Sequence, residues 1–206
     1  MQMMVGNFTP QPMSGWAVQF NKSAFGLAPS GPLQIAEVAP HNGTAQTLLS
    51  LSPNQLLTGA APSLPLTLEV AIKTSLDVFY LSVPYDLSAV LVDKGPVPKD
   101  QFQATWQGVG DKKARSMAQF AQKVSPEMVT ARMKQYYCYL VHQAQGDDAD
   151  LLYFSCGTTN KLTVFCELSL QRSAAGVMMQ CCSDAPPLIP LFQAFMSELL
   201  RVRWQG

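Results

Sequence analysis

Few residues of this 206-residue chain have the types and spacing that catalysis or metal binding requires. The two histidines, His41 and His142, have no carboxylate or cysteine at ligand spacing nearby, so we interpret both as surface residues. The segment GVGDKK lacks the full pattern of a phosphate-binding loop, and Ser14 lacks the flanking glycines of a nucleophile elbow. The acidic QGDDAD turn is more typical of a solvated loop than of a metal site. We therefore expect no enzyme, no cofactor and no metal.

The charge of the chain gives no sign of a nucleic-acid partner. Its 14 basic and 14 acidic residues cancel, and no basic cluster exceeds Lys112, Lys113 and Arg115. No apolar run reaches the roughly 20 residues of a membrane span, and the first residues lack the layout of a signal peptide. Five cysteines without CxxC spacing argue against both a disulfide framework and a zinc site. We expect a soluble intracellular chain with no nucleic acid bound and no direct membrane insertion.

Aromatic residues are the remaining candidates for a binding site. Trp106 stands in FQATWQGVGD, directly before a polar segment with two glycines. Such a ring is either packed in the core or exposed to bind a ligand. Burial is the commoner outcome, because it removes roughly 150 to 250 Å² of surface from water. In the predicted hairpin of LLYFSC and KLTVFCEL, joined across 157–160, Tyr153 and Phe165 are roughly cross-strand and Glu167 is a diagonal neighbour. This face suits a peptide groove, or a second packing face under a helix.

A second aromatic candidate lies in the first half of the chain. Period-two alternation along DVFYLSV places Tyr80 on the wetter face of a predicted strand. A tyrosine in a field of small and polar side chains forms a shallow site, although an ordinary exposed tyrosine is the simpler interpretation. The outward positions on neighbouring predicted strands are Ala17, Gln19, Glu69 and Lys73.

The elements that position these residues divide the chain into two lobes. Short alternating runs separated by Pro and Gly turns predict an all-β sandwich over 1–96. Beyond the linker-like DKGPVPKD, 97–206 is predicted to form an α+β platform, with an antiparallel sheet flanked by helices. Its signals are a helix capped by Ser125, four strand-like runs and a C-terminal apolar stripe at helical spacing, with Asp184 as the candidate cap.

The chain resembles the appendage, or ear, of a clathrin-adaptor β subunit, a β-adaptin. The resemblance is carried by WAVQFNKSAFGLAPSGPL, LEVAIKTSLDVFY, QFQATW and, more loosely, LLYFSC with CELSL, and it covers almost the whole chain. It implies an immunoglobulin-like sandwich followed by a platform of antiparallel sheet and helices. Because the chain begins partway into the family's sandwich, we expect the first subdomain to be N-terminally incomplete.

The resemblance implies two peptide-binding surfaces, and it favours a Trp106 ring that is exposed for peptide binding. The platform residues that it implicates are Trp106, Tyr153 and Glu167, beside which Phe165 and Gln107 complete the predicted site. The sandwich-side residues that it implicates are Tyr80, Ala17, Gln19, Lys22 and Lys73. Gln107 stands where animal members carry a lysine, and Ala114 and Ala144 replace an acid and a basic residue, so we expect an aromatic-anchored groove with an altered charge preference.

The function that the resemblance implies is that of a non-catalytic recruitment module. Its partners would be short motifs in disordered accessory proteins, clathrin, and the other adaptor subunits through an N-terminal trunk. Its place would be cytoplasmic, on clathrin-coated vesicles or pits at the plasma membrane or at the trans-Golgi network and endosomes. The alternative is a structural scaffold domain whose aromatic residues serve interdomain packing, in which case the final helix or the sandwich lobe would cover Trp106 and Tyr153.

Overall fold

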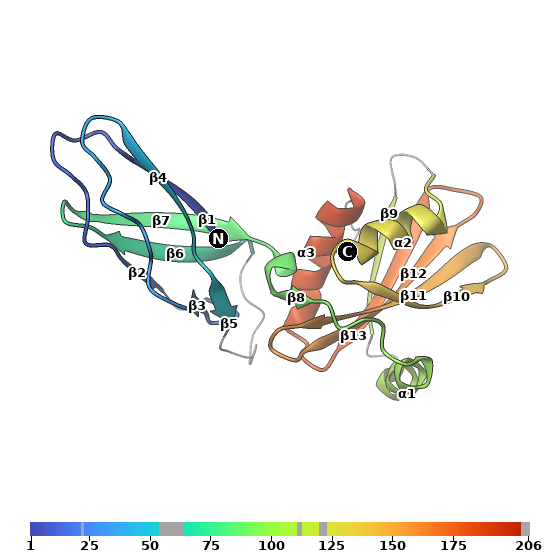
Figure 1. The fold of residues 1–206 in the computed structure, drawn as a ribbon. Coiled ribbons are helices and arrows are strands. Elements are labelled where there is room, and N and C mark those ends of the chain that lie inside the picture. Colours follow the sequence, from blue (N-terminus) through green and yellow to red (C-terminus); the bar gives the residue numbers. More distant parts are fainter. Residues whose placement is uncertain (22, 54–63, 111–112, 120–122, 203–206) are drawn as a thin grey trace. The chain divides into compact units, whose positions relative to one another are not determined.

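The computed structural model describes residues 1–21, 23–53, 64–110, 113–119 and 123–202 (Figure 1). The chain divides into two compact units, one ending at Tyr85 and the other beginning at Asp86. The predicted division at 96/97 lies later than this. The cause is the short strand β8 (Leu91–Val92), which follows the 3-10 helix η1 (Leu87–Val90) and pairs with strand β11 of the second unit.

The first unit is built from β-strands, as the alternating sequence runs predict. All of its strand pairs are antiparallel, and they form a three-stranded sheet in the order β2-β6-β7 and two-stranded sheets β1-β4 and β3-β5. The strands are β1 (Gln2–Asn7), β2 (Ala17–Phe20), β3 (Leu27–Pro29), β4 (Gly43–Leu48), β5 (Leu51–Pro53), β6 (Leu66–Lys73) and β7 (Val78–Tyr85).

Strand β6 shows how the pattern positions the core of this unit. Its apolar side chains alternate with polar or small ones, and Leu66, Leu68, Val70 and Ile72 are all buried. Because successive side chains point to opposite faces of a strand, the other set, Thr67, Glu69, Ala71 and Lys73, points away from the core. The outward face of the sheet is therefore the one on which the predicted Tyr80 site lies.

In its described residues, the second unit is a sheet with three α-helices. The sheet order is β10-β11-β12-β13-β9, with β8 also paired to β11, and every pair is antiparallel. The four predicted strands and the two predicted helices are confirmed, whereas α1 and β9 were not predicted. The elements are α1 (Lys99–Val109), β9 (Ala114–Gln119), α2 (Pro126–Lys134), β10 (Tyr139–Gln145), β11 (Ala149–Thr158), β12 (Thr163–Gln171), β13 (Gly176–Ser183) and α3 (Leu188–Leu200).

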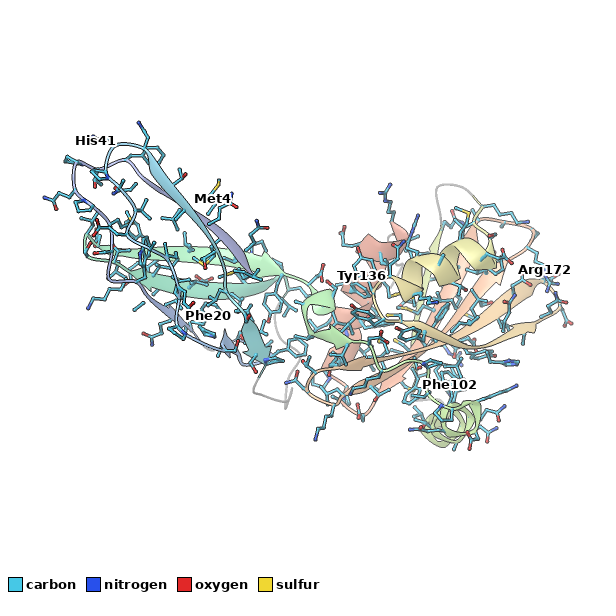
Figure 2. The ribbon with its side chains drawn as sticks, viewed as in Figure 1. Met4, Phe20, His41, Phe102, Tyr136 and Arg172 are labelled. Atoms are coloured by element: carbon cyan, nitrogen blue, oxygen red, sulfur yellow. The ribbon has the colours of Figure 1, made fainter. Side chains whose placement is uncertain are left out.

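The two faces of this sheet are covered by different helices. Helix α3 contacts β12 and β13, α2 contacts β10 and α3, and the side chains beneath them, including Leu152, Phe154 and Leu168, are buried. Helix α1 lies against the opposite face (Figure 1), toward which its Phe102 points (Figure 2). Of the described helices, none is long and apolar enough to cross a membrane.

The helix ends agree only in part with the sequence signals. Ser125 caps α2, since its hydroxyl accepts a hydrogen bond of 3.3 Å from the Met128 amide. The prediction of Asp184 as the cap of α3 is wrong, because that helix begins after Pro187 without a side-chain cap. The Asp184 carboxylate instead accepts a 3.1 Å hydrogen bond from the Thr163 amide and so ties β13 to the start of β12.

Candidate functional site

Helix α1 carries Trp106 onto the face of the second unit's sheet that lies opposite α3; this unit is called the platform from here on. Phe102 and Trp106 are four residues apart, so they lie on one side of the helix, and their rings stack at 5.4 Å. Phe102 is only 4% exposed and meets Phe165 of β12 edge to face at 5.4 Å. The helix ends at Gly110, whose φ of 56° lies in the left-handed region that glycine adopts easily. Phe102 is therefore the anchor that fixes the position of Trp106.

Tyr153 occupies the centre of a row of side chains that crosses the sheet. Its direct cross-strand partners are His142 on β10 and Glu167 on β12, and Glu167 in turn pairs with Gln180 on β13. The predicted register, with Phe165 opposite Tyr153 and Glu167 diagonal, is wrong, because Phe165 pairs with Ser155. The reason is that β11 continues to Thr158 and the turn follows it, two residues later than the sequence pattern indicates.

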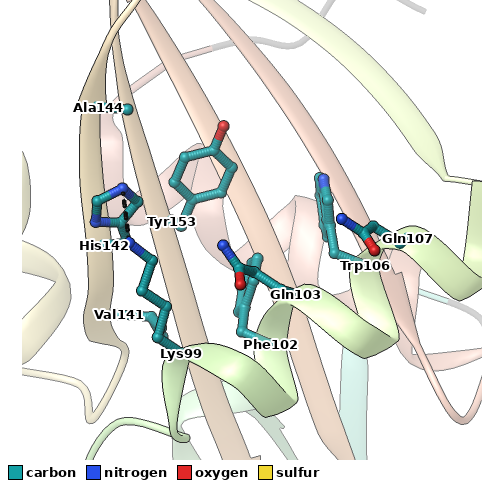
Figure 3. A pocket seen from close by; sticks show the side chains of 9 residues that line it. All are labelled: Lys99, Phe102, Gln103, Trp106, Gln107, Val141, His142, Ala144 and Tyr153. Atoms are coloured by element: carbon teal, nitrogen blue, oxygen red, sulfur yellow. Dashed lines mark hydrogen bonds between the residues drawn. The ribbon is translucent and has the colours of Figure 1, made fainter.

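A pocket of about 260 Å³ opens between α1 and strands β10 and β11 (Figure 3). Trp106 and Tyr153 meet edge to face across it at 6.4 Å between ring centroids, and both side chains are half-buried. The rings that contact them come from α1 and the sheet, not from α3, which lies on the other face. The residues that line the pocket are Lys99, Phe102, Gln103, Trp106, Gln107, Val141, His142, Ala144 and Tyr153.

Charged groups lie close to the rings of the pocket, with Lys99 beside His142, Glu167 beside Tyr153 and Lys113 over Trp106. Burial, then the charge of Glu167 and a hydrogen bond to it, raises the pKa of Tyr153 to about 12, so the phenol stays protonated at neutral pH. The Lys113 ammonium lies 4.8 Å from the centroid of the Trp106 ring, a cation–π contact. Beyond Tyr153, the His142 ring stacks on the phenol at 6.1 Å, and its Nε2 lies 3.3 Å from Lys99 Nζ.

The structure brings together most of the predicted platform residues. Trp106, Tyr153 and Gln107 line the pocket, whereas Glu167 stands behind Tyr153 and accepts a 3.3 Å hydrogen bond from the Gln180 amide. The assignment of Phe165 as a ligand-contacting residue is wrong, because that side chain is only 5% exposed beneath Phe102 and packs the sheet against the helix.

Several lining residues were missed from the sequence. Phe102 and Val141 supply apolar walls, and Lys99 and His142 supply polar groups at the far end. The spacing of Phe102 and Trp106 is a helical signal that could have located α1 and the pocket with it. His142, interpreted from the sequence as a surface residue, is half-buried because its partners come from α1 and β11.

The sandwich-side candidates form a flatter and more polar surface. Gln19, Ala71 and Tyr80 line up across β2, β6 and β7, and Ala17 and Lys73 form the next row along the sheet. Tyr80 is 80% exposed and borders a hollow of about 340 Å³. Lys22 lies outside the described residues. The lining residues of the hollow are Gln19, Phe20, Asn21, Glu69, Val70, Ala71 and Tyr80.

Neither surface carries the groups of a metal centre. Among the described residues, no group of three or more His, Cys, Asp or Glu side chains is arranged to hold a metal ion. The five cysteines are free and buried, and burial raises the pKa of Cys166 and Cys181 well above the ordinary thiol range. What the two surfaces offer a ligand is aromatic area, a few amides and isolated charges.

Comparison with known proteins places this architecture in a family. The model of the beta2-adaptin appendage, C-terminal sub-domain, matches residues 92–200. The AP-1 complex subunit beta-1 of Homo sapiens is 32% identical over 176 residues, which is 83% of this chain and 18% of that protein. The mouse protein of the same name is 32% identical over 203 residues, 97% of this chain and 21% of that protein.

A more distant relative aligns over a similar share of this chain. The AP-1 complex subunit beta of Dictyostelium discoideum is 18% identical over 197 residues, 94% of this chain and 21% of that protein. The chain thus spans about a fifth of the length of the curated relatives that it matches. From the family match across the platform unit and the similarity over most of its length, the chain belongs to the beta-adaptin appendage family.

Proposed function

We propose that this chain is a non-catalytic recruitment module that binds short peptide motifs of trafficking proteins, and clathrin, through two aromatic-centred surfaces. The observation that carries the proposal is the pair of half-buried rings, Trp106 and Tyr153, facing each other across a pocket of about 260 Å³. A pocket of this size suits one or two apolar side chains, since sites for whole small molecules run from roughly 300 to 1,000 Å³. Phenylalanine or leucine is the expected anchor.

The packing around the platform pocket supports its use as a docking site. Its rings are held by the buried Phe102 and by strands in the middle of a sheet. A site built on such elements loses little conformational entropy when it binds, so the ordering cost falls on the guest segment. Disordered guests lose entropy on ordering, so we expect weak binding at one site and stronger binding when several sites are engaged together.

The second proposed surface is the outward face of an immunoglobulin-like sandwich around Tyr80. Its proposed contacts are Tyr80, Gln19, Ala17 and Lys73, with Lys22 added by the family resemblance. The exposure of Tyr80 supports this assignment, because tyrosines are enriched in interfaces, where ring and hydroxyl are both used. Because the Tyr80 ring is mostly exposed, this surface is the one we assign to broader and weaker contacts.

The proposed cellular setting is supported by the names of the relatives, which place those proteins in the AP-1 complex. We propose that the chain acts as part of a β subunit of such an adaptor, in the cytoplasm on clathrin-coated vesicles or pits, at the trans-Golgi network and endosomes or at the plasma membrane. Contacts with other adaptor subunits are assigned to parts of the relatives that this chain does not match.

A peptide titration with two variants tests the proposal. Blocked Ser/Gly peptides that carry one phenylalanine or leucine are screened as an array, and the strongest is titrated into the isotope-labelled chain by NMR. Trp106→Ala should weaken platform binding roughly thirtyfold and leave the fold intact, whereas Tyr80→Ala should leave platform binding unchanged. If Trp106→Ala binds as well as the unmodified chain but unfolds more easily, the indole serves packing and the scaffold alternative replaces the proposal.

A further inference from the structure

Strand β1 leaves one edge of its two-stranded sheet open, since among the described strands it pairs only with β4. The backbones of Met1 and Leu49 exchange two hydrogen bonds of 2.8 Å, which makes them a hydrogen-bonded pair. Bonded and non-bonded pairs alternate along an antiparallel ladder, so Gln2, Met4 and Gly6 lie in the non-bonded pairs. The N–H and C=O groups of these three residues therefore point to the open edge.

The outer face of this sheet is apolar. Met4, Phe8 and Leu48 are 75%, 77% and 75% exposed, and Met4 projects away from the sheet (Figure 2). Leu48 is a diagonal neighbour of Met4 across the strand pair. The Phe8 ring folds over Gly6, where it lies 3.1 Å from the position that a Cβ atom would take. Single exposed apolar side chains are common, but three within one two-stranded sheet form a patch.

Strand β1 also lacks the features by which proteins protect an open edge. Charged side chains, prolines and bulges normally prevent a further strand from pairing there, since free N–H and C=O groups are a template for one. The strand has the sequence QMMVGN, with no charge and no proline, and its register with β4 has no bulge. By contrast β9, an edge strand of the platform sheet, carries the exposed Arg115.

The open edge of β1 is complementary to itself. When two copies meet antiparallel about a two-fold axis at Met4, this residue lies opposite its own counterpart and Gln2 lies opposite Gly6. All three residues then form hydrogen-bonded pairs, with two backbone hydrogen bonds in each pair. Identical surfaces meet at such an axis, so a charge near it would face a like charge, and neither β1 nor β4 contains one.

We propose that the chain self-associates through β1, which pairs antiparallel with β1 of a second copy and joins two β1-β4 sheets into one sheet of four strands. The contact is much smaller than the roughly 20 to 30 residues a side of a standard interface, so the association is weak. The inference goes beyond the proposed function and does not depend on it, because none of these residues lines the platform pocket or the hollow beside Tyr80.

Sedimentation velocity from micromolar to millimolar chain tests the proposal. The mean mass should rise with concentration toward twice that of one chain. Hydrogen exchange followed by NMR tests the mode of pairing over the same range. The amides of Gln2, Met4 and Gly6 should become protected as the concentration rises, whereas those of Met3 and Val5, which already bond to β4, should change less.

Two changes at Met4 separate pairing of the edges from contact between the faces. Met4→Pro removes an N–H that points to the open edge and no bond to β4, and Met4→Lys sets two like charges opposite each other. Both variants should stay monomeric while circular dichroism shows them folded. The control Gln46→Lys places the same charge on the same face, one strand away from the edge, and should still associate.

Two results would overturn the inference by themselves: a chain that stays monomeric at millimolar concentration, and an association that survives Met4→Pro. A third uses an added alternating Thr/Val peptide as a probe. If this peptide protects the amides of Gln2, Met4 and Gly6 in a chain that remains monomeric, the edge receives a different strand and not a second copy, and the inference is equally wrong.

Discussion

The two candidate surfaces present their aromatic residues in different ways. On the platform, Trp106 and Tyr153 are half-buried and are held by Phe102, which is itself sealed against the sheet. On the first unit, Tyr80 stands 80% exposed on β7, the edge strand of a three-stranded sheet, with small or polar neighbours in its row. The platform rings are therefore packed against neighbouring rings, whereas the Tyr80 ring stands mostly free of its neighbours.

We therefore expect the burial around a ring to determine how much that ring contributes to binding. A residue at the centre of a desolvated pocket contributes much more to binding than one at an exposed rim. Removing a group from the platform should thus change either the fold or the affinity sharply, and removing Tyr80 should change little besides local contacts.

The largest effect is expected for the anchor beneath the tryptophan. Phe102→Ala should lower the free energy of unfolding by about 3 to 5 kcal/mol, because it empties a packed site between α1 and β12. The measurement is denaturant unfolding followed by far-UV circular dichroism. The matched control is Phe8→Ala in the first unit, where the ring is 77% exposed and the change should be within about 0.5 kcal/mol. Equal losses for the two variants would contradict the assignment of Phe102 as an anchor.

The next effect concerns affinity at the pocket. Trp106→Ala should weaken the binding of a phenylalanine peptide by about 2 kcal/mol, roughly thirtyfold, because it removes one wall of the pocket. Calorimetry or NMR titration measures the loss, and circular dichroism confirms that the variant is folded. An affinity within twofold of that of the unmodified chain would show that the phenylalanine of the peptide binds elsewhere.

A smaller effect is expected at the exposed tyrosine. Tyr80→Ala should weaken any peptide bound to the sandwich-side surface by no more than about 1 kcal/mol, since the ring is not enclosed by neighbours. The stability of the chain should change by less than about 0.5 kcal/mol, as for other exposed positions. A loss as large as that of Trp106→Ala would show that Tyr80 is the centre of a closed site and would break the contrast.

The smallest effect is expected on the pKa of Tyr153. Tyr153 has a pKa of about 12 in the folded chain against an ordinary value of 10.0, so folding favours the protonated phenol. This stabilisation is present below pH 10 and is lost as the pH rises through 12. Glu167→Gln should lower the pKa of Tyr153 yet leave it above 10, because burial is the larger cause. Ultraviolet titration measures the pKa of Tyr153 in the unmodified chain and in Glu167→Gln, and Tyr153→Phe identifies its transition. An unchanged pKa in Glu167→Gln would show that Glu167 does not raise the pKa of Tyr153.

Much of the fold could be predicted because its hydrophobic pattern is regular. In β6 the apolar residues alternate strictly with outward ones, and in β11 and β12 alternation separated the buried Leu152, Phe154 and Leu168 from the opposite face of Tyr153. Alternation fixes the face of a side chain, but the register of a hairpin depends on its turn. That is why Glu167 was expected diagonal to Tyr153 and lies directly opposite it.

The two elements that were not predicted, α1 and β9, have weak or irregular patterns of apolar residues. Helix α1 buries only Phe102 completely, and it lies between a proline-rich segment and glycines, so the spacing of Phe102 and Trp106 is the main helical signal in its sequence. In β9 the inward positions include Ser116, whose hydroxyl accepts a 2.6 Å hydrogen bond from Gln193 of α3, while Met117 points outward and is exposed. Since α1 was not predicted, the lysine and histidine that meet at its start, Lys99 and His142, could not be brought together from the sequence.

The response of the indole NMR signals to a bound peptide shows whether Trp106 receives a guest side chain. In an NMR titration with a blocked phenylalanine peptide, the Nε1–H resonance of Trp106, assigned with Trp106→Phe, should shift with peptide concentration. That of Trp16, whose indole nitrogen is buried in the first unit, should stay in place. Binding that leaves the Trp106 resonance unmoved would contradict the claim that this ring receives the guest side chain.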